Sequence, residues 1–177
     1  MTKHLLTGLA VSVLLSGAPA MADSTSNFVQ IHGFASHDQG FVCSVIPDQN
    51  SVSLLELPET LIKQGDNATK PIAVHLQIGG NDKCADQIAA GKMAYRFSGT
   101  IDNADGTALA NSLTDDTAAK GVAIGIFDGN NKPVKVNTDQ MVATTVTTFG
   151  LQMVQLTGQE AVAGNINALV TIDIVRL

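Results

Sequence analysis

The final segment of the chain constrains the fold most. From Gly164 to position 174 every second residue is apolar, and the residues that follow the glycine in this phase are Ile166, Ala168, Val170, Ile172 and Ile174. Most residues between them are polar. This alternation is typical of a β-strand with one face in a core, because successive side chains point to opposite faces of a sheet. The fold must therefore contain a sheet that buries one face of its last strand.

The rest of the sequence also predicts an all-β fold. Short alternating or β-branched runs are separated by turn residues, and long helical periodicity is scarce. About seven short strands in roughly 150 residues are typical of an immunoglobulin-like β-sandwich. We leave open whether 86–92 or 108–119 forms a short helix or a long loop. The expected strands cover 28–35, 41–46, 52–57, 72–78, 92–100, 121–127, 133–136, 142–154 and 166–175.

Residues 1–22 have the pattern of a secretory signal peptide. Lys3 and His4 precede an apolar run over 5–15, and Ala20-Met21-Ala22 forms a small-residue exit. A membrane anchor would need roughly 20 apolar residues, which this run does not reach. We therefore expect export, with one domain following the signal peptide and no membrane-embedded part.

Two cysteines, Cys43 and Cys84, are present. In an exported protein a lone pair of cysteines usually forms a disulfide. Such a crosslink stabilises the fold by about 4 kcal/mol on the loop-entropy model. A metal or redox site would want a C-x-x-C motif or histidines at ligand spacing, and the histidines show no such grouping. We predict one disulfide, no metal and no cofactor.

Composition and motifs argue against two classes of function. Acidic residues outnumber basic ones by 16 to 10, and no basic cluster suits a nucleic acid. The sequence has no G-x-S-x-G, no H-E-x-x-H and no phosphate-binding glycine loop. The acidic run 102–105 is more typical of an Asx turn than of a cation site. We therefore predict neither an enzyme nor a nucleic-acid-binding protein.

Several segments together resemble subunits of chaperone-usher fimbriae, most closely their minor, tip-proximal subunits. Gly164 lies fourteenth from the C-terminus, where the family pattern also has a glycine followed by alternating apolar residues. Arg176 departs from the pattern, because the family usually has an aromatic residue next to last. The segments that carry the resemblance are Ala22-Asp23-Ser24-Thr25, Val29-Gln30-Ile31-His32-Gly33-Phe34, Gly40-Phe41-Val42-Cys43-Ser44-Val45, Phe97-Ser98-Gly99-Thr100, Gly121-Val122-Ala123-Ile124-Gly125-Ile126 and Ala163-Gly164-Asn165-Ile166-Asn167-Ala168.

The resemblance implies an incomplete immunoglobulin-like sandwich that lacks its seventh strand. A hydrophobic groove then stays open beside the C-terminal strand, an aggregation hazard unless it is covered. In the family a periplasmic chaperone fills the groove first, and the N-terminal extension of the next subunit later replaces it by strand addition. The residues expected on the groove strand here are Gly164, Ile166, Ala168, Val170, Ile172 and Ile174.

The corresponding donor strand is expected within an N-terminal extension over 23–36, ahead of a pilin domain over 37–177. This extension starts polar and then alternates, as suits a strand that becomes ordered in a neighbour's groove. The alternative is that it pairs within its own domain. The residues expected to act in the donor strand are Phe28, Val29, Ile31 and Gly33.

These features predict a structural subunit of an adhesive fimbria, in a minor or tip-adaptor role. The expected partners are neighbouring subunits, a periplasmic chaperone and an outer-membrane usher, with export through the periplasm to the surface fimbria. The alternatives are a major rod subunit of the same system or a secreted lectin-like binding protein. With no Trp and one Tyr, the chain offers little surface for stacking on sugars.

Overall fold

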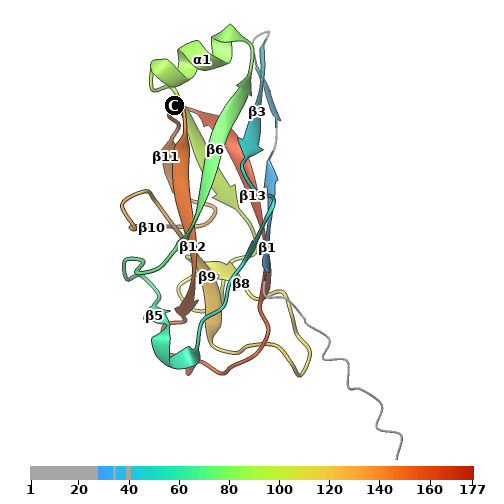
Figure 1. The fold of residues 1–177 in the computed structure, drawn as a ribbon, viewed down its shortest axis with the longest axis vertical. Helices are drawn as coiled ribbons and strands as arrows, with labels where there is room; N and C mark the ends of the chain where they lie inside the picture. Colours follow the sequence, from blue (N-terminus) through green and yellow to red (C-terminus); the bar gives the residue numbers. More distant parts are fainter. Residues whose placement is uncertain (1–27, 34, 39–40) are drawn as a thin grey trace, which may run out of the picture.

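The computed structural model describes residues 28–33, 35–38 and 41–177. The predicted signal peptide over 1–22 and the first residues of the predicted extension, 23–27, lie outside the described residues. In the described part the chain forms two β-sheets that pack face to face (Figure 1). This confirms the predicted all-β, sandwich-like fold.

Within the described residues the first sheet has five strands. Its C-terminal strand β13 lies in the middle, between β7 and β1. In spatial order the strands are β11 (Gln140–Val142), β7 (Met93–Ser98), β13 (Asn167–Arg176), β1 (Phe28–Gly33) and β4 (Ser51–Ser53).

The second sheet, again within the described residues, has eight strands. Two short strands lie off its main path: β5 (Ile62–Lys63) pairs with β12, and β8 (Leu109–Ala110) pairs with β9. The main path runs β10 (Pro133–Val134), β9 (Val122–Phe127), β12 (Thr147–Gln155), β6 (Ile72–Gly80), β3 (Phe41–Pro47) and β2 (Ala35–Asp38).

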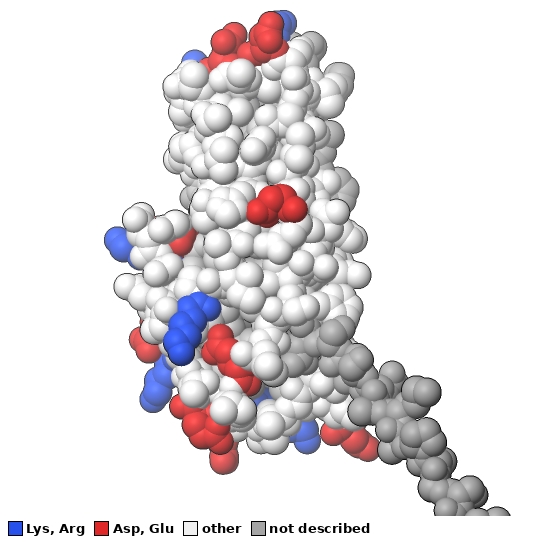
Figure 2. All heavy atoms as spheres, viewed as in Figure 1, with Lys and Arg blue, Asp and Glu red and all other residues white. Residues whose placement is uncertain are grey.

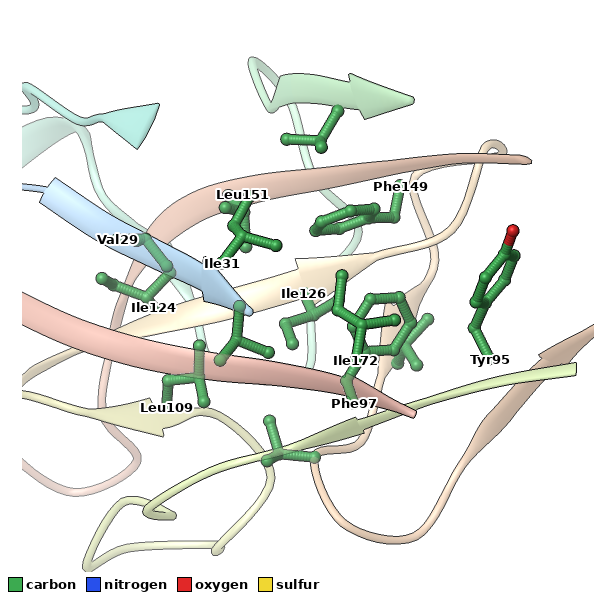
Figure 3. Packing of buried hydrophobic residues seen from close by; sticks show 14 of the residues in the cluster. Val29, Ile31, Tyr95, Phe97, Leu109, Ile124, Ile126, Phe149, Leu151 and Ile172 are labelled. Carbon is green, nitrogen blue, oxygen red and sulfur yellow. The ribbon is translucent and has the colours of Figure 1, made fainter. Parts of the chain in front are cut away.

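Side chains from both sheets form one continuous core (Figure 3). The rings of Phe97 on β7 and Phe149 on β12 lie 4.9 Å apart and tilted, so aromatic contact links the two sheets. Other fully buried large side chains are Tyr95, Phe127, Leu76, Met93, Leu109, Ile124, Ile126, Leu151, Ile166 and Ile172.

The predicted disulfide is present. Cys43 on β3 and Cys84 on α1 (Asp82–Ala89) are bonded, with their Cα atoms 5.9 Å apart. Gly80 ends β6 at a φ of 145°, and a Cβ there would lie 2.5 Å from the Cys84 sulfur. A glycine is therefore needed where the chain turns from β6 toward the helix.

The structure decides the two segments left open and shortens one expected strand. The helix α1 begins at Asp82 and overlaps 86–92, while among the described elements 108–119 holds only β8 and a loop. The strand expected over 52–57 ends as β4 at Ser53, and a short 3₁₀ turn, η1 (Pro58–Thr60), follows it. These differences arise where tertiary contacts, rather than alternation, decide the local structure.

The strand expected over 142–154 is divided into β11 and β12. The side chain of Thr147 accepts the backbone N–H of Thr144, and the Thr144 hydroxyl donates to the Val146 carbonyl. Such local side-chain bonds favour a turn over a continuous ladder. The turn moves the chain from the five-stranded sheet to the eight-stranded sheet.

Candidate functional site

The candidate site is the space beside β13 in the five-stranded sheet. The inward residues of β13, namely Ala168, Val170, Ile172 and Ile174, are all buried. Antiparallel β7 covers one edge of the strand over six residue pairs. The other edge is the one that the sequence predicts to be open.

In the structure this second edge is occupied by β1 of the same chain. Each of the six residues of β1 has a partner on β13 in a parallel ladder, from Phe28 opposite Asn167 to Gly33 opposite Ile172. Val29 is 0% exposed and Ile31 is 2% exposed. Figure 3 shows both side chains pointing between the sheets toward the core. The strand β1 therefore supplies part of the hydrophobic interior.

The structure thus differs from the expectation of an open groove and shows the alternative of pairing within the same domain. The physical reason is that β1 alternates in phase with β13, so that a parallel register buries the apolar residues of both strands. Phe28 is only half-buried and Gly33 is exposed, although both are expected to act in the donor strand. Val29 and Ile31 are the two side chains that fill the groove.

Gly33 lies where β1 passes close to the other sheet. A Cβ at this position would lie 2.9 Å from the Cβ of Val45 and 3.0 Å from the Val45 carbonyl oxygen. Distances this short force a shift of the neighbouring backbone. The glycine therefore permits the close approach of β1 to β3.

The second wall of the groove is β4, which sequence analysis did not assign to the site. It pairs with β1 over three residues, with Val52 opposite Val29, and Val52 is buried. Beyond this ladder the backbone N–H of Ile31 donates to the Asn50 carbonyl. The Val52 and Leu54 alternation after the turn at 47–50 is the signal in the sequence that predicts this wall.

The pairing of β1 with β4 is incomplete. The chain crosses from β3 in one sheet to β4 in the other over 48–50, so β4 does not reach the last residues of β1. A surface hollow of about 610 Å³ remains there, lined by Gln30, Ile31, His32, Gly33, Asn50 and Ser51. The end of β1 is thus held on one side by β13 and is open on the other.

Asp48 fixes this crossing to the neighbouring strand β6. Its backbone N–H donates to the His75 carbonyl, and its carboxylate accepts the His75 backbone N–H. The His75 ring nitrogen Nδ1 lies 2.8 Å from the same carboxylate. Slight desolvation raises the pKa of Asp48, but the bonds from His75 more than offset this and lower it. The crossing is therefore a defined feature rather than a loose loop.

Two of the expected groove residues do not lie on the groove strand. Ile166 is buried but precedes β13, and Gly164 is exposed in the loop before it. A Cβ at Gly164 would lie 2.5 Å from the Ala119 backbone nitrogen, so this glycine allows two loops to pack closely. In this structure Gly164 therefore serves the packing of the loop that precedes β13. Arg176, at the position of the usual aromatic residue, pairs with Met93 at the end of β13.

The acidic turn over 102–105 closes on its own backbone. The carboxylate of Asp102 accepts N–H bonds from Ala104, Gly106, Thr107 and Ala108, at 2.8 to 3.1 Å. Burial alone would raise the pKa of Asp102, but these bonds and one from the Gln64 side chain lower it below its ordinary value of 3.8. The turn prediction fits this arrangement, although Asp102 is buried rather than solvated.

The described surface offers little for other kinds of site. Among the described residues no three His, Cys, Asp or Glu side chains are grouped as a metal site. The face in Figure 2 is largely uncharged over β6 and β3 apart from one acidic group, with both acidic and basic groups over α1 and at the opposite end. In the described part of the chain, no helix has both the length and the apolar character to cross a membrane.

The comparisons with known proteins identify the family to which this chain belongs. The sequence model of a family described as Fimbrial protein matches residues 39–175. No curated protein matches the chain. The matched residues include β3, the disulfide, β4 and nearly all of β13, but they exclude β1.

Proposed function

We propose that this chain, which belongs to the fimbrial protein family and is a structural subunit of a pilus, polymerises by exchanging β1 between subunits. In this proposal β1 of one subunit enters the groove between β13 and β4 of its neighbour. The observation that supports it is β1 itself, an N-terminal strand that pairs with β13 along its whole length and lies outside the part that matches the family.

The energetic argument rests on what the groove loses without β1. Val29 and Ile31 are buried against both sheets, so their removal leaves an apolar trough in the core and two unpaired strand edges. Burying a Val or Ile side chain stabilises a fold by about 1.5 to 3 kcal/mol each. An exposed trough of this kind binds a foreign strand or aggregates. A strand of the same sequence from a second copy satisfies it equally well.

The partners follow from this proposal. Neighbouring pilus subunits are expected from the family itself. We propose further that a periplasmic chaperone protects the groove during export by adding a strand of its own, and that an outer-membrane usher exchanges it for β1 of the next subunit. The surface fimbria is then the final location of the protein.

A pair of single substitutions on β1 tests the exchange. Val29→Asp places a charge on the buried face, whereas Gln30→Asp places the same charge on the exposed face of the same strand. We expect Val29→Asp to abolish incorporation into fibres and Gln30→Asp to preserve it, because only the first buries an unpaired carboxylate. Fibres are scored by electron microscopy of cells that express the chaperone and usher.

Truncation gives the complementary test. A chain that lacks 23–33 is expected to fold with the chaperone and still to accept a synthetic peptide with the sequence of 23–38, yet not to donate to a neighbour. Normal polymerisation by the truncated chain overturns the proposal. A truncated chain that neither folds with chaperone nor binds the peptide also counts against it, because the body and the strand are then inseparable.

Within the pilus we propose a minor or adaptor position rather than the rod. The support is the resemblance of the extension around 29–34 and of the Gly-Asn-Ile-Asn ending to minor subunits. Labelling an epitope on this chain tests the position along isolated fibres. Label confined to one end supports the adaptor, and label along the whole shaft assigns the chain to the rod.

A further inference from the structure

We infer that the free subunit holds itself in a latent, self-capped form, in which β1 must leave its own groove before the subunit can accept a neighbour's strand. This inference rests on the proposed strand exchange and adds a means of regulation to the same groove. The competing strands are then β1 of the same chain and β1 of a second copy.

The closed form is a complete fold. All six residues of β1 are in register with β13 from Asn167 to Ile172, and Val29 and Ile31 are buried in the groove. A second copy of β1 therefore cannot enter while the first is in place. The affinity of the subunit for a neighbour's strand is reduced in proportion to the small fraction of open molecules.

The closed form is also built to open. The ladder between β1 and β13 is parallel, which is slightly less stable per residue than an antiparallel one. The pairing with β4 covers only three residues, and the hollow beside Gly33 leaves the end of β1 unpaired on that side.

The connections of β1 point the same way. Within the chain β1 is followed by β2, which pairs with β3 at the edge of the other sheet. The described body is thus joined to the C-terminal end of β1 through β2. Release of β1 from β13 leaves the pairing of β2 with β3 in place.

A designed crosslink tests the self-capped form. Gln30 and Leu169 are register partners, and both side chains are exposed. Adjacent strands lie about 4.8 Å apart, and disulfides need Cα atoms about 4.4 to 6.8 Å apart. We expect Gln30→Cys with Leu169→Cys to form an intrachain disulfide in the purified mature subunit, and this disulfide to block both polymerisation and the binding of the 23–38 peptide.

A matched control lies on the other edge of β13. Arg96→Cys with Asp173→Cys joins register partners of β7 and β13, which keep their places in any exchange. This crosslink is expected to form equally well and to leave polymerisation unchanged. A mild reductant should restore polymerisation of the first variant while it spares the native disulfide, because Cys43 and Cys84 are buried. Mass spectrometry of peptides verifies which cysteines are paired.

The outcomes separate the two proposals. If the two cysteines introduced by Gln30→Cys and Leu169→Cys remain unpaired in the monomer, the self-capped form is wrong while strand exchange can still stand. The same holds if the crosslinked subunit polymerises normally. If the reduced variant and the wild-type chain both ignore the 23–38 peptide, and the chain without 23–33 still polymerises, strand exchange itself is wrong. Blocked assembly that reductant restores supports both.

Discussion

The two neighbours of β13 show how a sheet can hold one strand permanently and another provisionally. On one edge β7 forms an antiparallel ladder of six pairs and contributes Met93, Tyr95 and Phe97 to the core. On the other edge β1 also forms six pairs, but in parallel, and contributes Val29 and Ile31. The two edges thus have ladders of equal length.

The far sides of the two strands do not differ, because β11 pairs with β7 over three residues and β4 pairs with β1 over three residues. The difference lies in the direction of each ladder on β13 and in the size of the buried side chains, which are Met93, Tyr95 and Phe97 on β7 but Val29 and Ile31 on β1. Parallel pairing is slightly less stable per residue than antiparallel pairing. Ladder length alone therefore does not decide which strand can be replaced; the direction of the ladder and the apolar surface that each strand buries do.

The largest loss of stability is expected on the edge of β13 that pairs with β7, the permanent edge. Phe97→Ala removes a fully buried ring that contacts Phe149 across the core. We expect the free energy of unfolding to fall by about 3 to 5 kcal/mol, because the cavity cannot be refilled by neighbouring strands. Urea denaturation of the mature subunit measures it. A loss below about 1 kcal/mol would mean that β7 is as replaceable as β1.

A smaller loss of stability is expected on the edge of β13 that pairs with β1, the provisional edge. Ile31→Ala removes a side chain of β1 that is nearly as buried as Phe97. We expect the free energy of unfolding to fall by about 2 kcal/mol or less. The loss is limited because β1 can detach and leave the rest of the sandwich folded. Hydrogen exchange should show faster exchange of the β1 and β13 amides, with the β7 to β11 ladder unaffected. Equal acceleration in β11 contradicts the comparison.

A third substitution should affect both edges equally. Asp102→Asn removes a buried carboxylate that accepts four backbone N–H bonds in the described structure. We expect a loss of about 1 to 3 kcal/mol at pH 7, without faster release of β1. Peptide exchange at the groove and urea denaturation measure the two quantities. Selective opening of β1 by this variant would show that the loop and the groove are coupled.

The pH dependence of this loss has a defined sign. The pKa of Asp102 is lowered in the folded chain, so its stabilisation is present above the ordinary value of 3.8 and is lost as the pH falls through the lower folded value. The difference in stability between wild type and Asp102→Asn should therefore shrink below pH 3.8. A difference that grows on acidification contradicts the assignment.

The smallest effect is expected within β7. Burial raises the pKa of Tyr95 to about 12, with a small opposite effect of the nearby Thr147 side chain, so the hydroxyl is neutral. Among the described residues no group lies in good hydrogen-bond geometry to this hydroxyl. Tyr95→Phe should change the free energy of unfolding by less than about 1 kcal/mol, and in the stabilising direction. Thermal denaturation measures it, and a clear destabilisation would reveal a bond formed by the hydroxyl.

Much of the sandwich could be predicted from local pattern. The alternation from Ile166 to Ile174 predicted the buried face of β13, and the strands expected over 121–127 and 133–136 correspond to the paired strands β9 and β10. The disulfide followed from two cysteines in an exported chain. The first two signals each depend on segments close together in the chain. The disulfide depends on two cysteines that have one possible pairing.

The remaining features depend on contacts between distant segments. The same alternation in β1 suits its own groove and a neighbour's, so the sequence alone left both open. Gly164 is explained by a loop at Ala119 that is far away in the chain, and α1 starts early because the disulfide places Cys84 beside β3. Periodicity carries no information about such partners.

The position of the disulfide has a mechanical consequence in a polymer. If β1 is held by a neighbour, tension along the fibre enters each subunit through the edge strand β2 and then reaches β3. In β3, Cys43 is bonded to Cys84, so the load passes through a covalent link into α1 and β6 rather than peeling β3 from the sheet. Under traction the subunit would then resist unravelling from its loaded end, and a reduced fibre would stretch at lower force.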